Sequence, residues 1–525
     1  MVKTTFARRA RRATLAACAG AVALGLAACG SGGGSGDANP AEAVPSSAPI
    51  YIQATLRPDG ELKTNTENAL KKILKTDDPG AKIVQGLESG DNKVSFKDDI
   101  EPWLGNDAGL FFTSFSGDNP VGAAVVASSD NDKAQAFIDK QTKGGKDKSY
   151  NDTSYRLDGD TAVGIVGDYL VAGSERGFRT VVDTVNGDGV ENMSQNDEYN
   201  TALSSVGEQD ALGTIYVSTN GLIDALARSG GVPAQTLSGV RQAIASSGGR
   251  ATVAKLGVTQ DAIAIDAATL GVKQSSNAPA AGNAAAALAA LPGDSWLGFG
   301  VSSIGDRLRS GLQQITQLGS VGGTDVSGQL DTIQQQLGID FERDLFSWMG
   351  DGGLFVRGTS IAQIGGALVV QSSDPTATKS AIRKIARLIP QVSPTTDVSA
   401  ATGVAGADDG IAVTPSGFPF PILLVTAGDK FVAGVSKQAV EAAISPTSKL
   451  SDSPSFKQAS AALSGVDPTF FFDVQPVLTL ADGLGAGDDP QFARVRSYLQ
   501  QFGSVAAGSK RDGDTQRFKL VLTLK

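Results

Sequence analysis

The chain has 525 residues, of which 41% are hydrophobic and 19% are charged, and its formal net charge is −10. This length and balance indicate a folded protein of more than one domain and exclude general disorder. Histidine is absent and cysteine occurs only twice, which excludes Ser-His-Asp and Cys-His catalysis and imidazole metal ligands.

The first 28 residues have the pattern of an export signal. A basic segment precedes an apolar stretch, residues 13–28, that is too short and too rich in small residues for a membrane span. The stretch ends in Leu26-Ala27-Ala28-Cys29, which looks like the lipobox of bacterial lipoproteins, where the cysteine thiol carries lipid. A signal-anchor helix with an incidental cysteine is the alternative.

The charge of the processed chain suggests how it meets a membrane. Cleavage before Cys29 leaves 40 basic and 55 acidic residues, a net charge of −15, and residues 29–43 have the composition of a flexible tether. A chain this acidic is not expected to bind nucleic acid or to adhere to anionic lipid by charge. We expect an extracytoplasmic protein of the cell envelope, attached to the membrane through lipid on Cys29.

The rest of the sequence contains one long pattern twice. FKDDIEPWLGNDAGLFF begins at Phe96, and FERDLFSWMGDGGLFV begins at Phe341. Other blocks repeat in the same order, among them GAAVVASSD with GALVVQSSD and GDYLVAG with GDKFVAG. Such order predicts a duplicated unit, with a first repeat at 44–273 and a second at 291–525. Residues 274–290, rich in Ala, Ser, Asn and Pro, are expected to be a linker or a short solvated helix.

Within each repeat, short apolar runs bounded by Gly, Asp and Asn predict strands, and amphipathic windows predict helices. In the first repeat the runs are APIYIQATL, AGLFFTSF, VGAAVVAS, TAVGIVG and YLVAGS, and the helical windows include TENALKKILK and NDKAQAFIDKQ. Ser129 and Asp130 are candidate N-caps of the second window. Turns such as residues 157–160 favour antiparallel pairing. We therefore predict an α+β fold of two tandem homologous domains, each a mainly antiparallel sheet with packed helices.

The repeated Trp-Leu-Gly or Trp-Met-Gly element predicts a packing device. Apolar residues from Phe96 to Trp103 recur at helical spacing, which predicts an amphipathic turn and a half that ends at Gly105. Trp348 and Gly350 hold the same places in the second repeat. We expect each Trp to pin a short helix to the sheet and each Gly to be a left-handed helix end. A stacking platform for a ligand is the alternative role of the Trp.

The same residues carry a family resemblance. The pattern F-x-x-D-[IL]-x-x-W-[LM]-G, followed by a strand, resembles the bacterial envelope proteins catalogued as domain of unknown function 3352, over both repeats. The resemblance implies an exported, membrane-attached lipoprotein of actinobacterial type. It implies no activity, substrate or catalytic residue.

One segment distinguishes the repeats. Fourteen residues separate Val413 from Gly428, whereas three separate Val163 from Gly167, and the longer segment contains PSGFPFP. Its two aromatic residues are the candidate binding loop: Phe418 and Phe420. They form either an exposed apolar lip for a partner or an elongated hairpin that packs back on the sheet.

The remaining motifs favour binding over catalysis. SSDND and SSDP predict helix caps and lack the acidic ladder of a calcium loop, so we expect no metal, no cofactor and no catalytic residue. We expect a non-catalytic protein that binds a small molecule, a lipid or an envelope partner. A structural or cell-wall interaction protein is the second hypothesis. A hydrolase that uses carboxylates or a Ser/Lys pair is the third.

Overall fold

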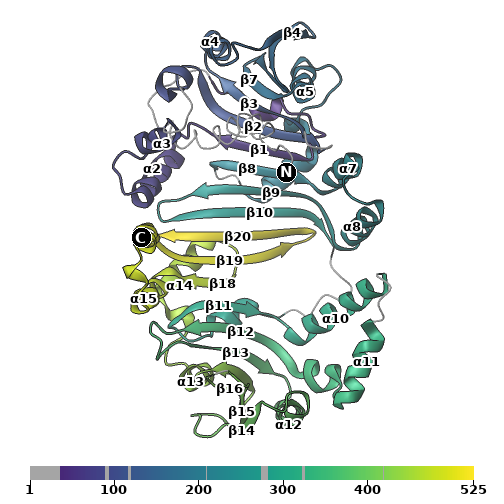
Figure 1. Ribbon diagram of the computed structural model, residues 1–525, viewed down its shortest axis with the longest axis vertical. Coiled ribbons are helices and arrows are strands. Elements are labelled where there is room, and N and C mark those ends of the chain that lie inside the picture. The colour runs from purple at the N-terminus through teal and green to yellow at the C-terminus, as the bar shows by residue number, and fades with distance from the viewer. Residues whose placement is uncertain are drawn as a thin grey trace, which may run out of the picture. The chain divides into compact units, whose positions relative to one another are not determined.

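The computed structural model describes residues 36–88, 94–115, 120–207, 210–273, 282–321, 326–417 and 419–525 (Figure 1). Helices and strands are mixed along the chain, and the strand registers in this part are antiparallel. The predicted combination of helices with a mainly antiparallel sheet is confirmed. Within these ranges, no helix has both the length and the apolar character that a membrane crossing needs.

The chain divides into two compact units. Unit 1 holds the described residues up to 273 together with Lys510–Lys519, and unit 2 holds the other described residues, including Leu520–Lys525. Residues 510–519, which fall within the predicted second repeat at 291–525, thus belong to unit 1. Within unit 1, Nζ of Lys519 lies 3.1 Å from a carboxylate oxygen of Asp266.

The sheet of unit 1 follows the predicted apolar runs, which become β1, β2, β3, β6 and β7. The strands are β1 (Ile50–Thr55), β2 (Leu104–Ser114), β3 (Val121–Ser128), β4 (Lys146–Tyr150), β5 (Thr153–Asp158), β6 (Thr161–Val166), β7 (Tyr169–Ser174), β8 (Gly213–Ser218), β9 (Gly248–Val258) and β10 (Ala262–Val272). Their order across the sheet is β4-β5-β6-β7-β3-β2-β1-β8-β9-β10. Gly159, at φ +61°, forms the predicted tight turn between β5 and β6.

The helices of unit 1 connect these strands. They are α2 (Gly60–Leu74), α3 (Pro79–Glu88), α4 (Asn131–Gln141), α5 (Glu175–Asn186), α6 (Asp197–Ser205), α7 (Thr219–Ser229) and α8 (Ala234–Ser247). Of the two candidate N-caps, Asp130 begins α4, because its side chain accepts the backbone N–H of Lys133 at 3.1 Å. The buried sides of α5 and α6 pack on one face of the sheet and form the main core of the unit.

The sheet of unit 2 has the same strand order as that of unit 1, position by position. Its strands are β11 (Ser295–Val301), β12 (Met349–Arg357), β13 (Gly365–Ser372), β14 (Asp397–Ala400), β15 (Asp409–Thr414), β16 (Ile422–Ala427), β17 (Lys430–Val435) and β18 (Pro468–Asp473), followed by β19 (Phe502–Asp512) and β20 (Thr515–Leu524), whose residues are divided between the units. The order is β14-β15-β16-β17-β13-β12-β11-β18-β19.

The helices of unit 2 lie between strands at corresponding places in the chain. They are α9 (Ala284–Ala289), α10 (Ile304–Val321), α11 (Val326–Leu337), α12 (Pro375–Val392), α13 (Lys437–Ile444), α14 (Pro454–Leu463), α15 (Val474–Gly483) and α16 (Pro490–Leu499). At the start of α12, Asp374 accepts the backbone N–H groups of Thr376 and Ala377, each at 2.9 Å. The SSDP segment is thus a helix cap, as its sequence predicts.

The predicted tether and the predicted linker each contain folded residues near their C-terminal ends. Residues 29–43 are predicted as a tether, but Pro40–Glu42 form a 3-10 turn with Ala41 buried, and the Tyr169 hydroxyl donates to the Asn39 carbonyl at 2.8 Å. Residues 274–290 are predicted as a linker or a short solvated helix, and Ala284–Ala289 form the short helix α9, which buries Leu288 completely. Pro40–Glu42 are therefore part of the fold, and α9 is a short helix as one of the two alternatives predicts, although Leu288 packs on the sheet and is not solvated.

The tryptophan elements are buried, but their local shape differs from the prediction. Trp103 and Trp348 are 4% and 2% exposed, and their rings lie 5.4 Å from Phe137 and Phe431, respectively. The preceding residues form one π-helical turn, Phe96–Ile100 in unit 1 and Phe341–Leu345 in unit 2, instead of an amphipathic turn and a half. Each indole N–H donates to the carbonyl of the residue four places earlier, at 2.7 Å and 3.0 Å.

Gly105 and Gly350 are strand residues and not left-handed helix ends. They lie in β2 and β12, and neither is among the residues with positive φ in the described part. A Cβ on Gly105 would lie 2.7 Å from the Ala127 carbonyl oxygen, and one on Gly350 would lie 2.9 Å from the Gln371 carbonyl oxygen. Glycine is needed at both places because the next strand approaches too closely for a side chain.

Candidate functional site

The central strands of each unit are apolar on both faces. Successive side chains of a strand point to opposite sides of its sheet, so a strand such as IYIQAT or TFFFD presents apolar groups to both. On one face of unit 1, Tyr51, Phe111 and Tyr216 are almost fully buried in the main core. Strands of this composition are typical of sheets that are covered on both sides.

The opposite face of unit 1 is partly open. Cross-strand partners point to the same side of a sheet, and Ile52 faces Leu110 on β2 and Ile215 on β8. On the next strands Leu256 faces Ile265. Ile215, Leu256 and Ile265 are 40–46% exposed. Ile215 and Leu256 have this exposure although β8 and β9 each have a neighbouring strand on both sides. We call these five residues the open apolar face of unit 1.

Unit 2 also has a partly open apolar face, on β11, β12 and β18, the strands that correspond to β1, β2 and β8. Phe299 faces Leu354 on β12 and Phe470 on β18, and the two phenylalanine rings are 4.8 Å apart. Leu297 faces Phe472 in the same way. Phe299 and Leu354 are 39% and 42% exposed. These five residues are the open apolar face of unit 2.

Helices flank the ends of these strands. In unit 1, Figure 1 shows α2 and α3 at one end of β8 to β10 and α7 and α8 at the other. In unit 2, α10 and α11 lie at one end of β11 to β13, and α15 lies at the other. The side chains of both faces have no hydrogen-bonding group, and the backbone groups of the central strands are paired with their neighbours. Each face can therefore contact an apolar ligand but offers nothing to a polar one.

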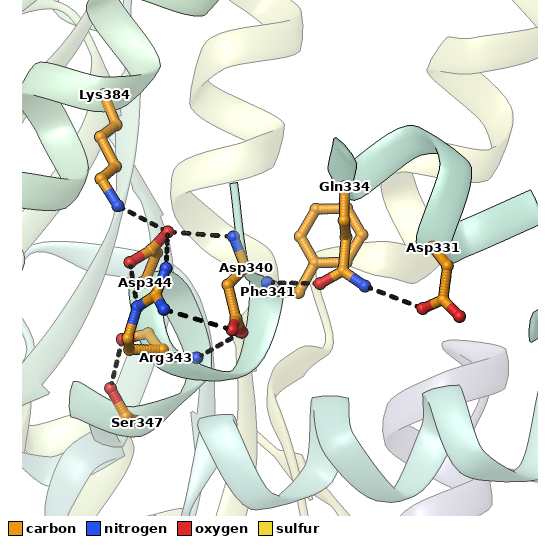
Figure 2. Close-up of polar contacts among 8 residues, drawn as sticks. All are labelled: Asp331, Gln334, Asp340, Phe341, Arg343, Asp344, Ser347 and Lys384. Carbon is orange, nitrogen blue, oxygen red and sulfur yellow. Dashed lines mark hydrogen bonds and ion pairs between the residues drawn. The ribbon is translucent and has the colours of Figure 1, made fainter. Parts of the chain in front are cut away.

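In each unit the repeated motif forms an ion pair between a largely buried aspartate and a partly exposed lysine. In unit 2, the Asp344 carboxylate accepts from Nζ of Lys384 on α12 at 2.6 Å and from the backbone N–H of Asp340 at 3.0 Å (Figure 2). In unit 1, Asp99 is paired with Lys140 on α4 at 2.5 Å. Each pair ties the π-helical turn before the tryptophan to the helix that packs on the sheet.

These aspartates are held in their ionised form. The Asp344 side chain is 8% exposed, and this burial alone would raise its pKa. Hydrogen bonds from Lys384 and from the N–H of Asp340 outweigh burial and lower the pKa to about 2. The hydrogen bond from Lys140 is the main reason that the pKa of Asp99 is below its ordinary value. A carboxylate with so low a pKa has no proton to donate at neutral pH, and its lone pairs are occupied.

Unit 1 carries a further charged cluster, around Glu175 at the start of α5. Its carboxylate accepts from the Tyr155 hydroxyl at 2.7 Å, from Lys148 at 2.9 Å and from Arg179 at 2.8 Å. These contacts, that of Tyr155 foremost, lower the pKa of Glu175 to about 2. The Glu175 cluster is thus another satisfied ion-pair network.

A polar depression of about 640 Å³ lies near this cluster. It is lined by Tyr150, Asn151, Asp152, Asp183, Asn186, Asp188 and Val190. Asp183 accepts from the Tyr150 hydroxyl and from the Asn151 amide. In the part of the chain that the structure describes, no three acidic, cysteine or histidine side chains are grouped to hold a metal ion.

The predicted site residues are not brought together. Cys29 and Phe418 lie outside the described residues. Phe420 is 57% exposed in the connection between β15 and β16, so it does not pack back into the sheet. Trp103 and Trp348 are buried in separate units and present no face to a ligand.

Sequence reasoning missed both the ion pairs and the open faces. The aspartate was visible as the D of F-x-x-D in both repeats, but its lysine partners lie about 40 positions later and no spacing links them. The open faces had a clearer signal, since IYI, LFF and FFF place apolar residues at successive positions of a strand. That signal predicts burial on both sides, and only the structure shows that one side is left open.

Comparisons with known proteins identify a family but no activity. A protein-family model described as "Protein of unknown function (DUF3352)" matches residues 12–524. No curated protein matches the chain. Among solved structures, "Structure of crystal form I of TP0453" is 12% identical, covers 45% of this chain and 79% of its own, and has a TM-score of 0.25. Crystal form III of the same protein is 11% identical, covers 46% and 82%, and has a TM-score of 0.26.

Proposed function

We propose that this chain, which belongs to the DUF3352 family of proteins of unknown function, is an exported, lipid-anchored protein that binds an apolar ligand without chemical turnover. The observation that carries the proposal is the open apolar face of each unit, which in both units includes the three equivalent central strands, β1, β2 and β8 in unit 1 and β11, β12 and β18 in unit 2. The lipoprotein character and the envelope location rest on the N-terminal sequence, above all on Cys29 and the basic and apolar segments before it, and the actinobacterial typing rests on the family resemblance alone.

The energetic argument starts from the half-exposed side chains. Full burial of a large apolar side chain stabilises a protein or a complex by about 1.5–3 kcal/mol. Phe299 and Leu354 are only partly buried in the free protein, so part of this stabilisation is absent until a ligand covers them. Contiguous exposed apolar groups on a folded protein mark places where a ligand or partner binds. A ligand that covers the face recovers the lost burial without any rearrangement of the sheet.

The chemistry of the faces favours alkyl chains over peptides. A peptide that lies on an apolar surface leaves its own N–H and C=O groups without partners, at a cost of roughly 1–3 kcal/mol for each group. An alkyl chain has no such groups. The central strands also have neighbours on both sides, so they cannot accept an added strand. We therefore assign the acyl chains of a lipid as the ligand class.

We further propose that the two units are tandem homologous domains with one site each. The identical strand order, the paired tryptophans and the paired Asp–Lys contacts support a duplication. Because each unit has its own open apolar face, the chain should bind ligand at both.

Turnover is not part of the proposal. The carboxylates with strongly lowered pKa values, Asp344 and Glu175, are satisfied by basic and hydroxyl groups. A structural or cell-wall interaction role is the second hypothesis, and a hydrolase that uses carboxylates or a Ser/Lys pair is the third. Native mass spectrometry of the protein from its own envelope separates them, since only the first predicts a co-purified lipid.

A charge placed on an open face should abolish binding at that face alone. Replacing Leu354 with Lys should weaken binding of a fluorescent fatty acid to unit 2 by about tenfold or more, because an ammonium group would have to be desolvated. The stoichiometry of tight binding should fall from two to one. Titration fluorimetry measures both quantities.

Two controls make this result specific. Thr376→Lys adds the same charge at an exposed helix start and should leave binding unchanged, and Leu354→Met should keep it. The melting temperature of Leu354→Lys should stay close to the parent value, because Leu354 is already 42% exposed. Equal binding by the parent and by Leu354→Lys would remove the face from consideration as a ligand site.

The lipid anchor is tested separately. Cys29→Ala should release the protein from membranes or leave an unprocessed precursor, because no other cysteine remains after the signal to accept lipid. Membrane fractionation and intact mass measure the outcome. A Cys29→Ala protein that fractionates and migrates like the parent would show that the anchor assignment is wrong.

A further inference from the structure

Three connections of unit 2 meet at one end of its sheet. Gly366 pairs with Val435, Val435 pairs with Ile422, and Ile422 pairs with Val413. This row crosses β13, β17, β16 and β15, so the strand ends beside it lie at the same end. The connection between β12 and β13, residues 358–364, and that between β15 and β16, residues 415–421, both leave from this row. Residues 393–396 lead to Asp397, which pairs with Thr414 at the same place.

Four large apolar side chains that the structure describes in or beside these connections are exposed. Ile361 is 69% exposed, Phe420 is 57% exposed, and Val392, the last residue of α12, is 68% exposed. Ile364 is also exposed. They lie at connections and a helix end rather than inside strands, so they are displayed beyond the end of the sheet and belong to a surface separate from the open apolar face.

The same segments carry no charge. Residues 358–364, 388–396 and 415–421 contain no Asp, Glu, Lys or Arg, although 19% of the chain is charged. Of the charged groups beside these segments, Arg357 is paired with Asp294 and Lys437 with Glu441, the latter at 3.8 Å, whereas Asp397 lies in the row itself, opposite Thr414. Uncharged connections with protruding apolar groups enter the boundary of a lipid bilayer without the cost of desolvating a charge of their own.

We infer that this end of unit 2 contacts the surface of the bilayer to which the chain is anchored. The inference rests on the proposed lipid anchor, which holds the protein beside a membrane where weak apolar contacts are effective. A bilayer suits these side chains better than a protein partner does, because they lie on separate connections that carry no charged group to specify a complementary surface. Unit 1 has only the short polar turn Gly159-Asp160 in place of the β15–β16 connection, so the contact belongs to unit 2.

The test uses the lipidated full-length protein and single labels. The processed chain contains no cysteine other than Cys29, so Ile361→Cys and Phe420→Cys each introduce one thiol for the environment-sensitive dye NBD. Thr376→Cys is the matched control, because Thr376 is exposed at the start of α12, beyond the opposite end of β13. The unsubstituted protein serves as the labelling blank. Each protein is added to phosphatidylcholine vesicles, with and without doxyl-labelled phosphatidylcholine.

We expect NBD at 361 and 420 to shift to the blue on vesicles and to be quenched by doxyl lipid about threefold more strongly than NBD at 376. Flotation of the vesicles reports the anchor independently. Flotation without a shift at 361 and 420 overturns this inference and leaves the anchor intact. Absence of flotation overturns both. A blue shift without vesicles that rises with protein concentration assigns the surface to a second copy or another protein and also overturns it.

Discussion

Replacing Trp348 with Ala should lower the free energy of unfolding of unit 2 by about 3–5 kcal/mol, the usual cost of emptying a large aromatic site. The side chain is 2% exposed, it packs against Phe431, and its indole N–H satisfies the Asp344 carbonyl at 3.0 Å. Removal leaves a cavity between the π-helical turn and the sheet and an unpaired carbonyl beside it. Urea unfolding followed by hydrogen exchange in peptides of each unit measures the loss.

Trp348→Phe is the matched control for this substitution. It keeps most of the ring volume and removes only the indole N–H, so it should cost about 1 kcal/mol. Trp103→Ala should have the same effect in unit 1 and leave the exchange rates of unit 2 unchanged. Wild-type stability in Trp348→Ala would contradict the packing role assigned to both tryptophans.

Replacing Asp344 with Asn should make the stability of unit 2 less dependent on acid. The pKa of Asp344 is lowered from 3.8 to about 2 in the folded protein, so the folded state prefers the ionised form. That preference stabilises the fold by about 2 kcal/mol above pH 5. The contribution disappears as the pH falls from about 4 to about 2, because the carboxylate is then protonated in both states.

The parent and Asp344→Asn should therefore differ by about 2 kcal/mol at pH 7 and converge near pH 2. Urea unfolding of both proteins at a series of pH values measures this difference. Asp99→Asn is the matched variant in unit 1, where the pKa of Asp99 is lowered in the same direction by Lys140. A difference that stays constant from pH 7 to pH 2 would show that the Asp344–Lys384 pair does not hold the carboxylate ionised.

The strands and many turns could be predicted from the sequence because their signals are local. The VGAAVVAS and YLVAGS runs are β3 and β7, and Asp130 caps α4 as its position suggests. Gly105 was wrongly predicted, because a glycine after an apolar helical pattern has two explanations. Both a left-handed helix end and a close approach of two backbones require glycine, so the sequence alone does not distinguish them. The position of Ala127 in the structure shows that close approach is the reason at Gly105.

The candidate site was harder to predict because it depends on which face of each sheet is left uncovered by helices. TFFFD predicts a strand that is apolar on both sides, and Phe471 is indeed fully buried. Whether the side of Phe470 is covered depends on where the helices after β18 and β11 pack, which is a long-range property. The pairing of Asp344 with Lys384 is long-range in the same way, since residue spacing does not show that α12 crosses the turn.

The central position of β1 in the sheet also delays folding of unit 1 until β8 has been synthesised. β1 is the first strand of unit 1 to be made, yet it lies between β2 and β8, and Ile50 pairs with Val217. β11 has the same relation to β18 in unit 2. Contacts of such large sequence separation slow folding, because a long loop has to close before they form. The central strand of each unit therefore stays incomplete until most of that unit has been synthesised.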